Sequence, residues 1–587
     1  MRLLIFILAW CGGVEGVFGS ALRIEITPQV AGQALQPASL RYETSAGEKF
    51  SVTRVSYLVS ELALQRADGS WLECSNDVAW LDLEQNRNSF RLGQIPPGEY
   101  RSLRFAMGLN TNLNHVDPAS YPSHHPLNPN LNGLHWSWQG GYIFLALEGL
   151  WRNGAGELDG WAYHLARDGH VARIVLPLGL DLREEAKLEL DFDLGALLNA
   201  PRPLSFGVDG SSTHSRDDDP VAAALLQNLP GAFRVRAVRT LTEAEVARAH
   251  PAPLYLPAKF TSFPFQMAAS FPQPDLPRDN PLTVERVTLG RALFFEKRLS
   301  VNNRQSCADC HAPRLAFTDG RRQSRGAEGA LGERNAMPLF NLAWKRAFFW
   351  DGRAATLREQ VLQPMQNPME MHESLTNLPA KLRGAGADYP ALFAQAFGSP
   401  DITVEKMALA LENYLLTLTS CDAKFDRVLR GEESFSAEEQ RGFELFSTEY
   451  DPRRGQFGAD CFHCHGGPLF QSQAFANNGL DTDFSDIGRA KITGKDYDRG
   501  KFAVPSLRNV AVTAPYMHDG RFRTLEEVVE HYAGAVKRSA TLDPNLAKHP
   551  DAGLPLNQAD RGALVAFLRT LTDRQFSPAS EKNLAEN

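Results

Sequence analysis

Two short stretches of the chain carry cysteines and a histidine at the spacing that attaches a c-type haem. Both read Cys-x-x-Cys-His: Cys307, Cys310 and His311 in the first, and Cys461, Cys464 and His465 in the second. In such a motif the two thiols bond to the vinyl groups of the porphyrin, and the histidine becomes the proximal ligand of the iron. The two motifs therefore predict two covalently bound haems.

A lone Cys-x-x-Cys pair is also typical of zinc and redox sites, which is the alternative interpretation. A zinc ribbon pairs two such motifs about 15–20 residues apart. Here the motifs begin at residues 307 and 461, and a histidine directly follows each second cysteine. This arrangement, on a chain that begins like an exported protein, favours haem.

Residues 1–20 have the pattern of a secretory signal. Arg2 precedes a short apolar run, Leu3–Trp10, and small residues surround Ser20 and Ala21, where we expect cleavage. The tryptophan before Cys11 fits a lipoprotein signal poorly, so we expect no lipid anchor. The run is shorter than the ~20 residues that span a bilayer, and no later run is long enough. Because c-type haems are attached outside the cytoplasm, we predict a periplasmic protein without an integral membrane segment.

Composition sets the broad class. The chain has 587 residues, of which 43% are hydrophobic and 22% charged, so it has room for about three or four globular domains. A net charge of −8 gives no reason to expect nucleic acid or an anionic membrane as a partner. Outside the haem motifs and the signal, Cys74 and Cys421 remain. They could form a disulfide between domains, which an oxidising compartment permits, or be two separate buried thiols.

The haem motifs require helices around them, and the C-terminal half supplies them. From Thr283 onward, apolar residues recur every three or four positions. The expected helices are Val284–Phe295, Thr403–Leu418, Ala437–Phe446, Thr524–Tyr532 and Gln558–Leu571. Two motifs within such helices predict two cytochrome c-like lobes, at residues 281–425 and 430–580.

The N-terminal part, residues 22–240, is predicted to be β. Apolar and polar residues alternate in several runs separated by turn residues: Leu22–Ile26, Tyr57–Leu64, Val171–Leu182 and Ala186–Phe192. Short alternating runs of this kind indicate an antiparallel sandwich or barrel, of which we expect the sandwich. A proline-rich stretch, residues 241–280, shows little periodicity and is predicted to be a linker over the surface.

One β segment holds an unusual pair of tryptophans. Trp136 and Trp138 are two positions apart, so they share one face of an extended chain. Several histidines lie before and after them in the sequence: His115, His124, His125, His135, His164 and His214. Two interpretations stay open. The tryptophans are core residues beside polar loop histidines, or some of the histidines form a metal site, since imidazole suits copper and zinc.

This part of the chain resembles the MbnP family over roughly residues 22–235. The resemblance rests on His135–Glu148, on Pro126–Pro129 and on Trp161–His164. Members are exported β-sandwich proteins from methanobactin and copper-handling gene clusters. They bind copper, and in them a tryptophan oxidised to kynurenine helps to form the copper site. The resemblance implies a copper site here and makes Trp136 and Trp138 the candidates for modification.

Residues 279–575 resemble the bacterial di-haem cytochrome c peroxidases, within them the MauG and MbnH type. The motifs that carry the resemblance are Leu289–Phe295, Phe348–Arg353, Gln366–Met371, Val504–Val510 and Thr513–Gly520. The family implies hydrogen peroxide as oxidant and a cytochrome or cupredoxin as a possible electron donor. It also implies a calcium ion between the haems, bound by Asn335, Thr513 and Pro515. Oxygen ligands suit calcium.

The same resemblance assigns three catalytic residues. Trp350 matches the tryptophan that relays electrons between the haems, Glu370 the distal acid or base over the first haem, and Gln360 the distal amide. Without the family, Trp350 would be interpreted as a core residue and the other two as ordinary residues of a helix surface.

The chain differs from ordinary members of this family at two places, and these differences make the two haem sites unlike each other. Ordinary members close the first haem with a histidine on the loop that corresponds to residues 324–335, and this loop has none. The haem at His311 is therefore expected to be open. Ordinary members ligate the other haem with a methionine, whereas the corresponding position here is Tyr532, or His531 if the match slips by one residue. A phenolate ligand stabilises oxidised iron, whereas methionine raises the potential.

The predicted function is a peroxide-using di-haem oxidoreductase that converts a tryptophan of the fused β domain to kynurenine and so builds a copper site. One alternative is a peroxide-detoxifying cytochrome c peroxidase with an accessory metal-binding domain. Another is a copper-storage or delivery domain whose redox state the haems set.

Overall fold

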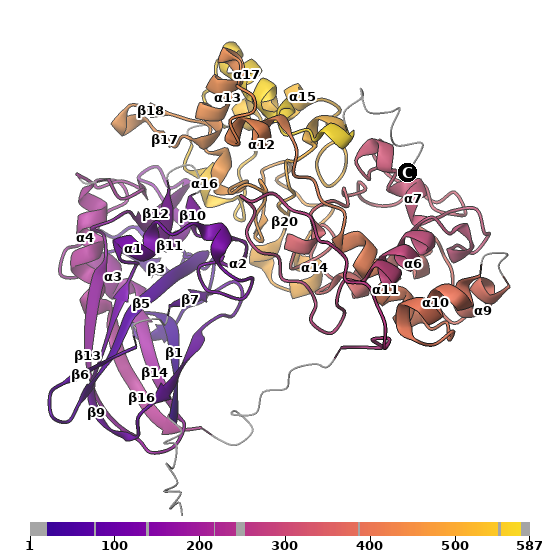
Figure 1. Cartoon of the computed structure of the whole chain (residues 1–587). Helices are drawn as coiled ribbons and strands as arrows, with labels where there is room; N and C mark the ends of the chain where they lie inside the picture. The colour runs from indigo at the N-terminus through magenta and orange to yellow at the C-terminus, as the bar shows by residue number, and fades with distance from the viewer. Residues whose placement is uncertain are drawn as a thin grey trace, which may run out of the picture.

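A computed structural model of the chain describes residues 20–74, 78–136, 140–216, 218–241, 253–384, 388–549 and 553–576. The predicted signal, apart from Ser20, and Trp138 lie outside the described residues. Figure 1 shows a β domain, coloured indigo to magenta, beside a mainly helical region coloured magenta to yellow. Within the described ranges, no helix is both long enough and apolar enough to cross a membrane.

The β domain consists of two sheets. The larger sheet has the order β13 (Ala172–Leu182), β9 (Gly98–Met107), β5 (Arg54–Arg66), β11 (Gly141–Arg152), β12 (Leu158–Ala166) and β15 (Ser212–Thr213). Short strands attach to its edges and ends: β3 (Tyr42–Glu43), β4 (Lys49–Phe50), β6 (Trp71–Glu73), β7 (Ala79–Asp82) and β10 (His135–Trp136). The smaller sheet has the order β16 (Phe233–Thr240), β14 (Ala186–Asp193), β1 (Ser20–Val30) and β2 (Gln33–Ala34), with β8 (Ser89–Ile95) also paired to β1.

One hydrophobic core lies between the two sheets. It contains Ile24 and Leu188 from the smaller sheet together with Tyr57 and Leu145 from the larger one. Most strand pairs are antiparallel, and the predicted β-sandwich is confirmed. Two pairings are parallel instead, β1 with β14 and β12 with β15. Strand partners distant in sequence are not visible in a local alternation pattern, so the sequence could not reveal them.

Strand alternation gives the larger sheet two different faces. On β12, Trp161, Tyr163 and Leu165 point into the sandwich core. Ala166 belongs to a second hydrophobic cluster, which also contains Phe462 and Phe567 of the helical region. Successive strand residues point to opposite faces, so His164 lies on the same outer face as Ala166. The outer face of β12 is therefore buried against the helical region.

The helical region has two lobes. The first holds α6 (Val284–Phe294), α7 (Cys307–Cys310), α8 (Leu357–Gln366), α9 (Leu378–Arg383), α10 (Tyr389–Phe397) and α11 (Val404–Leu416). The second holds α12 (Lys424–Leu429), α13 (Ala437–Ser447), α14 (Ala490–Thr493), α15 (Leu525–Gly534), α16 (Pro544–Ala547) and α17 (Gln558–Arg569). Small strands complete it: β17 (Tyr450–Asp451), β18 (Gln456–Phe457), β19 (Phe475–Ala476) and β20 (Phe502–Ala503).

The longer helices begin where a side chain caps them. Thr283, Thr403, Ser436, Thr524 and Asn557 each accept a hydrogen bond from a backbone N–H of the first turn. Such caps satisfy amide groups that have no partner within the helix. The five helices expected from the sequence are therefore present, with ends within about two residues of the predicted ones.

Each lobe contains one helix crossing that requires a glycine. A Cβ atom at Gly290 of α6 would lie 2.0 Å from the carbonyl oxygen of Ala410 on α11. A Cβ atom at Gly442 of α13 would lie 2.0 Å from the carbonyl oxygen of Ala563 on α17. The helices of the two lobes therefore cross in the same way, which fits the prediction of two cytochrome c-like lobes.

The β domain and the second lobe are in direct contact. A Cβ atom at Gly160 of β12 would lie 1.9 Å from the carbonyl oxygen of Pro544, at the start of α16. Arg538 donates a hydrogen bond of 2.8 Å to the carbonyl oxygen of Leu158. Figure 1 shows α16 at the end of the β domain, next to β12. This docking brings β-domain side chains close to the second haem motif.

The two remaining cysteines lie in different cores. Cys74 packs against the sandwich core and Cys421 against the core of the first lobe. Cys421 has a free thiol. The structure therefore favours separate thiols over a disulfide between domains.

Candidate functional site

The first haem motif opens into a cavity of about 570 Å³. Cys307, Cys310 and His311 line this cavity, as do Trp350, Gln360 and Glu370. The structure therefore brings the three predicted catalytic residues together with the first motif, although they are spread over the chain.

His311 is held as a proximal ligand requires. Its Nδ1 donates a hydrogen bond of 2.9 Å to the carbonyl oxygen of Phe317. Burial lowers the pKa of His311, which keeps the imidazole neutral. A backbone partner on Nδ1 fixes the tautomer and leaves Nε2 for a metal. With two thiols that form no disulfide, the motif fits a covalently bound haem.

Glu370 is a buried carboxyl group in the same cavity. One of its oxygens accepts a hydrogen bond of 2.9 Å from the side chain of Asn367. Burial raises the pKa of Glu370. The loop at residues 324–335, which lacks the closing histidine, passes close by. Its Ala327 donates a backbone hydrogen bond of 2.7 Å to the carbonyl oxygen of Glu370. This loop contributes Ser324, Arg325 and Gly326 to the cavity wall.

Trp350 links the two lobes. Its indole N–H donates a hydrogen bond of 2.9 Å to the carbonyl oxygen of Asn335. Its own carbonyl oxygen accepts one of 2.8 Å from Ala503 on β20. The side chain thus lines the first haem cavity while its backbone is bonded to the second lobe, as expected for a residue between the haems.

The second motif has a similar proximal arrangement. Nδ1 of His465 lies 3.3 Å from the carbonyl oxygen of Phe470 and 3.2 Å from that of Pro505. Burial lowers the pKa of His465 to about 4, so the imidazole is neutral. Cys461 and Cys464 form no disulfide. The second motif therefore also fits a covalently bound haem.

Tyr532 packs in the same hydrophobic cluster as Cys461 of the second motif. Burial, and to a smaller degree the neighbouring Cys464 and Cys461 thiols, raises the pKa of Tyr532. His531 directs Nε2 to the carbonyl oxygen of Asn478, 2.9 Å away. Of the two sixth-ligand candidates, the geometry therefore favours Tyr532.

The predicted calcium ligands are not joined to one another by hydrogen bonds in the described part of the chain. The amide of Asn335 donates to the carbonyl oxygen of Arg321, at 2.8 Å. The hydroxyl of Thr513 donates to the carbonyl oxygen of Val510, at 3.3 Å. Pro515 follows a cis peptide bond. The calcium site stays a prediction.

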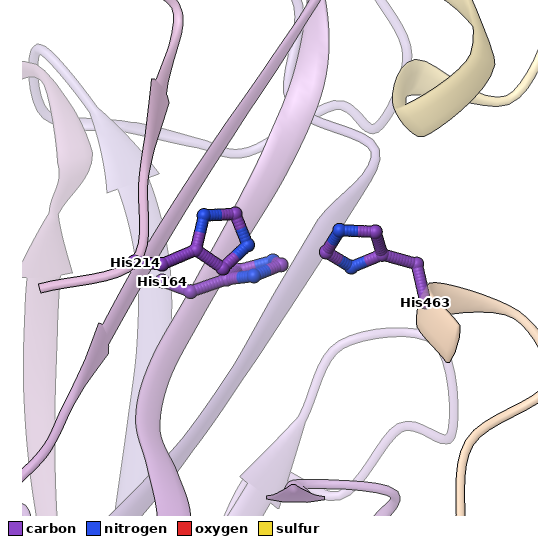
Figure 2. Close-up of side chains that lie close together, drawn as sticks. All are labelled: His164, His214 and His463. Atoms are coloured by element: carbon purple, nitrogen blue, oxygen red, sulfur yellow. The ribbon is translucent and has the colours of Figure 1, made fainter. Parts of the chain in front are cut away.

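A cluster of three histidines lies where the β domain meets the second lobe. His164 comes from β12, His214 from the segment after β15, and His463 from the second haem motif itself. One ligand atom from each lies within 4.8 Å of the others. Figure 2 shows the three rings pointing toward one another from the two sides of this contact.

Trp136 adjoins this histidine cluster. Its ring stacks on His214 with centroids 5.4 Å apart and planes at 29°, and it lies 6.2 Å from the ring of His164. The ring centroids of His214 and His463 are 5.3 Å apart. Trp136 is therefore two ring contacts away from a residue that lies between the two haem-binding cysteines Cys461 and Cys464.

The other histidines singled out in the sequence lie elsewhere. His115 pairs with Asp168 at 3.0 Å and is exposed. His125 stacks on Tyr121, and His135 contacts the edge of Tyr142. The sequence does not mark His463 as a ligand, because a histidine at the variable positions of a Cys-x-x-Cys-His motif has no meaning for haem attachment. Its only signal was that it is a metal-binding residue type.

Comparisons with known proteins divide the chain in the same way. The family model of di-haem cytochrome c peroxidase matches residues 284–434, and that of MbnP matches residues 19–215. The methylamine utilization protein MauG of Methylophilus methylotrophus is 35% identical over 307 residues, which are 51% of this chain and 87% of that protein. The chain belongs to the di-haem cytochrome c peroxidase family. It carries an MbnP domain in addition.

The chain is also similar to a second curated protein and to a solved structure. Cytochrome c peroxidase Ccp of Escherichia coli strain K12 is 36% identical over 312 residues, which are 51% of this chain and 61% of that protein. A crystal structure of a MauG-like protein associated with microbial copper homeostasis is 35% identical and covers 55% of this chain and 99% of its own, with a TM-score of 0.48. The family membership makes this di-haem peroxidase an oxidoreductase with two c-type haems that uses peroxide.

Proposed function

We propose that this di-haem peroxidase uses hydrogen peroxide to oxidise a tryptophan of its own β domain, in the Trp136 and Trp138 pair, to kynurenine, and that the product helps to form a copper site. The MbnP match over residues 19–215 supports a copper-related role for that domain. The single observation that carries the proposal is the chain of ring contacts from Trp136 through His214 to His463, with centroid distances of 5.4 and 5.3 Å.

The oxidation balances with two molecules of peroxide. Tryptophan and two peroxide molecules give N-formylkynurenine and two molecules of water, so four electrons leave the indole and reduce the peroxide. Hydrolysis then removes the formyl group as formate and leaves kynurenine. Peroxide therefore supplies all the oxidising equivalents, and the reaction needs no other co-reactant.

At the first haem, the residues of the cavity handle the peroxide. A haem held by Cys307, Cys310 and His311 would supply an iron that reacts with peroxide. Glu370, whose pKa burial raises, takes a proton from one peroxide oxygen and delivers it to the departing one. The amide of Gln360 donates a hydrogen bond that holds the peroxide in place. Because the loop at residues 324–335 has no histidine, the site is open to peroxide in the resting protein.

The second haem site is suited to store an oxidising equivalent. A phenolate ligand from Tyr532 stabilises oxidised iron over reduced iron. Trp350, bonded to both lobes, connects the two haem sites. Asn335, Thr513 and Pro515 would supply oxygen ligands to a calcium ion between the lobes. The predicted export signal at residues 1–20 supports a periplasmic location, where a cytochrome or cupredoxin can act as an electron donor.

The test is whether peroxide consumption requires an external electron donor. Holoprotein that oxidises its own tryptophan consumes about two peroxide molecules per chain without any donor and then stops. A detoxifying peroxidase consumes peroxide continuously and only with a donor such as a reduced cytochrome c. Absence of any donor-independent consumption would contradict the proposal.

A further inference from the structure

We propose that His164, His214 and His463 form a binding site for a copper or zinc ion that is complete only when the β domain is docked on the second lobe. Two ligands belong to the β domain and the third, His463, to the second haem motif. The site rests on the proposed copper-related function. It requires no oxidised tryptophan, so it exists in protein that has not been exposed to peroxide.

The spacing of the three histidines suits a metal ion. The candidate ligand atoms lie within 4.8 Å of one another. In a tetrahedral site with metal–nitrogen bonds of about 2.0–2.1 Å, two nitrogens are about 3.3 Å apart. Small side-chain rotations bring the three rings to that spacing. Their side chains are 1%, 12% and 4% exposed for His164, His214 and His463, so an ion there is shielded from water.

One ring nitrogen of His164 is free to bind a metal ion. Its Nε2 is bonded to a carboxylate oxygen of Glu148, 2.9 Å away. Its Nδ1 is buried and has no hydrogen-bond partner within the described part of the chain. Buried polar atoms without a partner are uncommon. A carboxylate on one ring nitrogen and a metal on the other is the usual arrangement of a ligating histidine.

Glu148 is itself held in place from both domains. Arg54 of the β domain donates a hydrogen bond of 2.7 Å to Oε1 of Glu148. Asn545 of α16 donates one of 3.2 Å to Oε2. The orientation of His164 therefore depends on the docked second lobe, in addition to the contribution of His463. Both features make the site a property of the two domains together.

Buried carboxylates place negative charge beside the cluster. Oε2 of Glu449 lies 2.8 Å from Nε2 of His463 and 2.9 Å from Nε2 of His214. Lys548 forms ion pairs with both Glu449 and Asp460. Two buried carboxylates thus share one ammonium group, which leaves a negative charge beside the imidazoles. A bound cation compensates it.

The chemistry of the ligands selects the metal. Imidazole suits copper and zinc, whereas calcium and magnesium require a set of oxygen ligands. No thiolate takes part among the described residues of the cluster. A single excess negative charge beside the imidazoles favours the monovalent copper ion over a divalent one.

Holoprotein that has never been exposed to peroxide provides the test. It is stripped with a chelator and titrated anaerobically with Cu(I) against a chromophoric competitor, and separately with Zn(II). We expect one equivalent to bind, with Cu(I) bound more tightly. In H463Q the affinity falls at least about tenfold, as it does in H164Q. H115Q, which removes an exposed histidine of the β domain, keeps the affinity of the parent protein.

The haem absorbance spectrum is recorded for each variant, so that a loss of haem is not mistaken for a loss of the metal site. Unchanged affinity in H463Q would overturn the proposal, because the site would then belong to the β domain alone. If the parent protein binds neither metal, the proposal is also overturned. The cluster is then only a network of hydrogen-bonded histidines and carboxylates. Neither result depends on whether peroxide oxidises a tryptophan.

Discussion

Trp136 and His463 belong to different domains but are joined through one intervening ring. The indole of Trp136 stacks on His214 at 5.4 Å, and His214 lies 5.3 Å from His463, between Cys461 and Cys464. A tryptophan of the β domain therefore lies one ring away from a residue of the second haem motif. This relationship is the physical basis of the proposed intramolecular oxidation.

Separating the two domains should stop the tryptophan oxidation without stopping the peroxide chemistry. The substitution Gly160→Ala places a Cβ atom 1.9 Å from the carbonyl oxygen of Pro544, so β12 can no longer dock closely on α16. We expect tryptophan modification to fall at least about tenfold, while peroxide turnover with an artificial electron donor stays unchanged. Gly154→Ala is the matched control, because a Cβ atom there meets no atom within 4 Å. Equal loss in both variants would speak against the docked arrangement.

Glu370→Gln should slow the reaction with peroxide about 10²–10⁴-fold, because proton transfer contributes that much to such reactions. Burial raises the pKa of Glu370 above its ordinary value of about 4.3. The carboxylate form is the base, so the rate of the parent protein rises as pH increases through this raised pKa. Stopped-flow absorbance over a pH series measures both effects. A rising limb that persists in the glutamine variant would assign the titration to another group.

Tyr532→Met should raise the reduction potential of the second haem, because methionine stabilises reduced iron relative to a phenolate. A spectroscopic redox titration shows whether one of the two haems shifts while the other keeps its potential. Tyr516→Phe serves as the control, since the Tyr516 hydroxyl instead donates to the carbonyl oxygen of Val510 at 2.9 Å. Two unchanged potentials in Tyr532→Met would mean that Tyr532 is not a ligand.

Lys548→Met should destabilise the protein by about 3–5 kcal/mol, because it leaves the buried carboxylates of Glu449 and Asp460 without their cation. Nearby His214 and Lys548 hold the pKa of Glu449 well below its usual range, despite an opposing effect of burial. A depressed pKa means that the ionised form stabilises the fold. This contribution is complete above the ordinary pKa of about 4.3 and is lost as pH falls towards the depressed one.

Urea unfolding at several pH values measures the stability. The parent protein should lose stability on acidification below pH ~4, and the methionine variant should lose less, since its carboxylates are no longer paired. Lys537→Met, at an exposed lysine, should change the free energy of unfolding by less than about 0.5 kcal/mol. A comparable loss in both variants would indicate that the buried ion pairs are not responsible.

The haem motifs and the helices around them could be predicted because their signals are local. Cys-x-x-Cys-His is contiguous, and capping residues such as Thr283 and Thr524 mark helix starts within one turn. Alternation along β12 also separates His164 from Trp161 and Tyr163, but it does not reveal that a second domain covers the outer face.

The histidine cluster could not be predicted from the sequence. His164, His214 and His463 are far apart in the chain. The pairing of β12 with β15 brings His164 and His214 together, and His463 joins them because β12 docks on α16. Of the histidines near the tryptophan pair, His115 and His135 were equally plausible ligands by type and position. Only the docked structure separates them from His164 and His214.

The central claim is that oxidising equivalents from peroxide end on a tryptophan of the same chain. The most direct measurement is peptide mass spectrometry of the holoprotein after peroxide is added without an electron donor. The account predicts oxygen gain on the peptide that holds Trp136 and Trp138. It predicts none on the peptide with Trp161, whose indole is buried in the sandwich core. The absence of oxygen gain on every β-domain tryptophan peptide would contradict it.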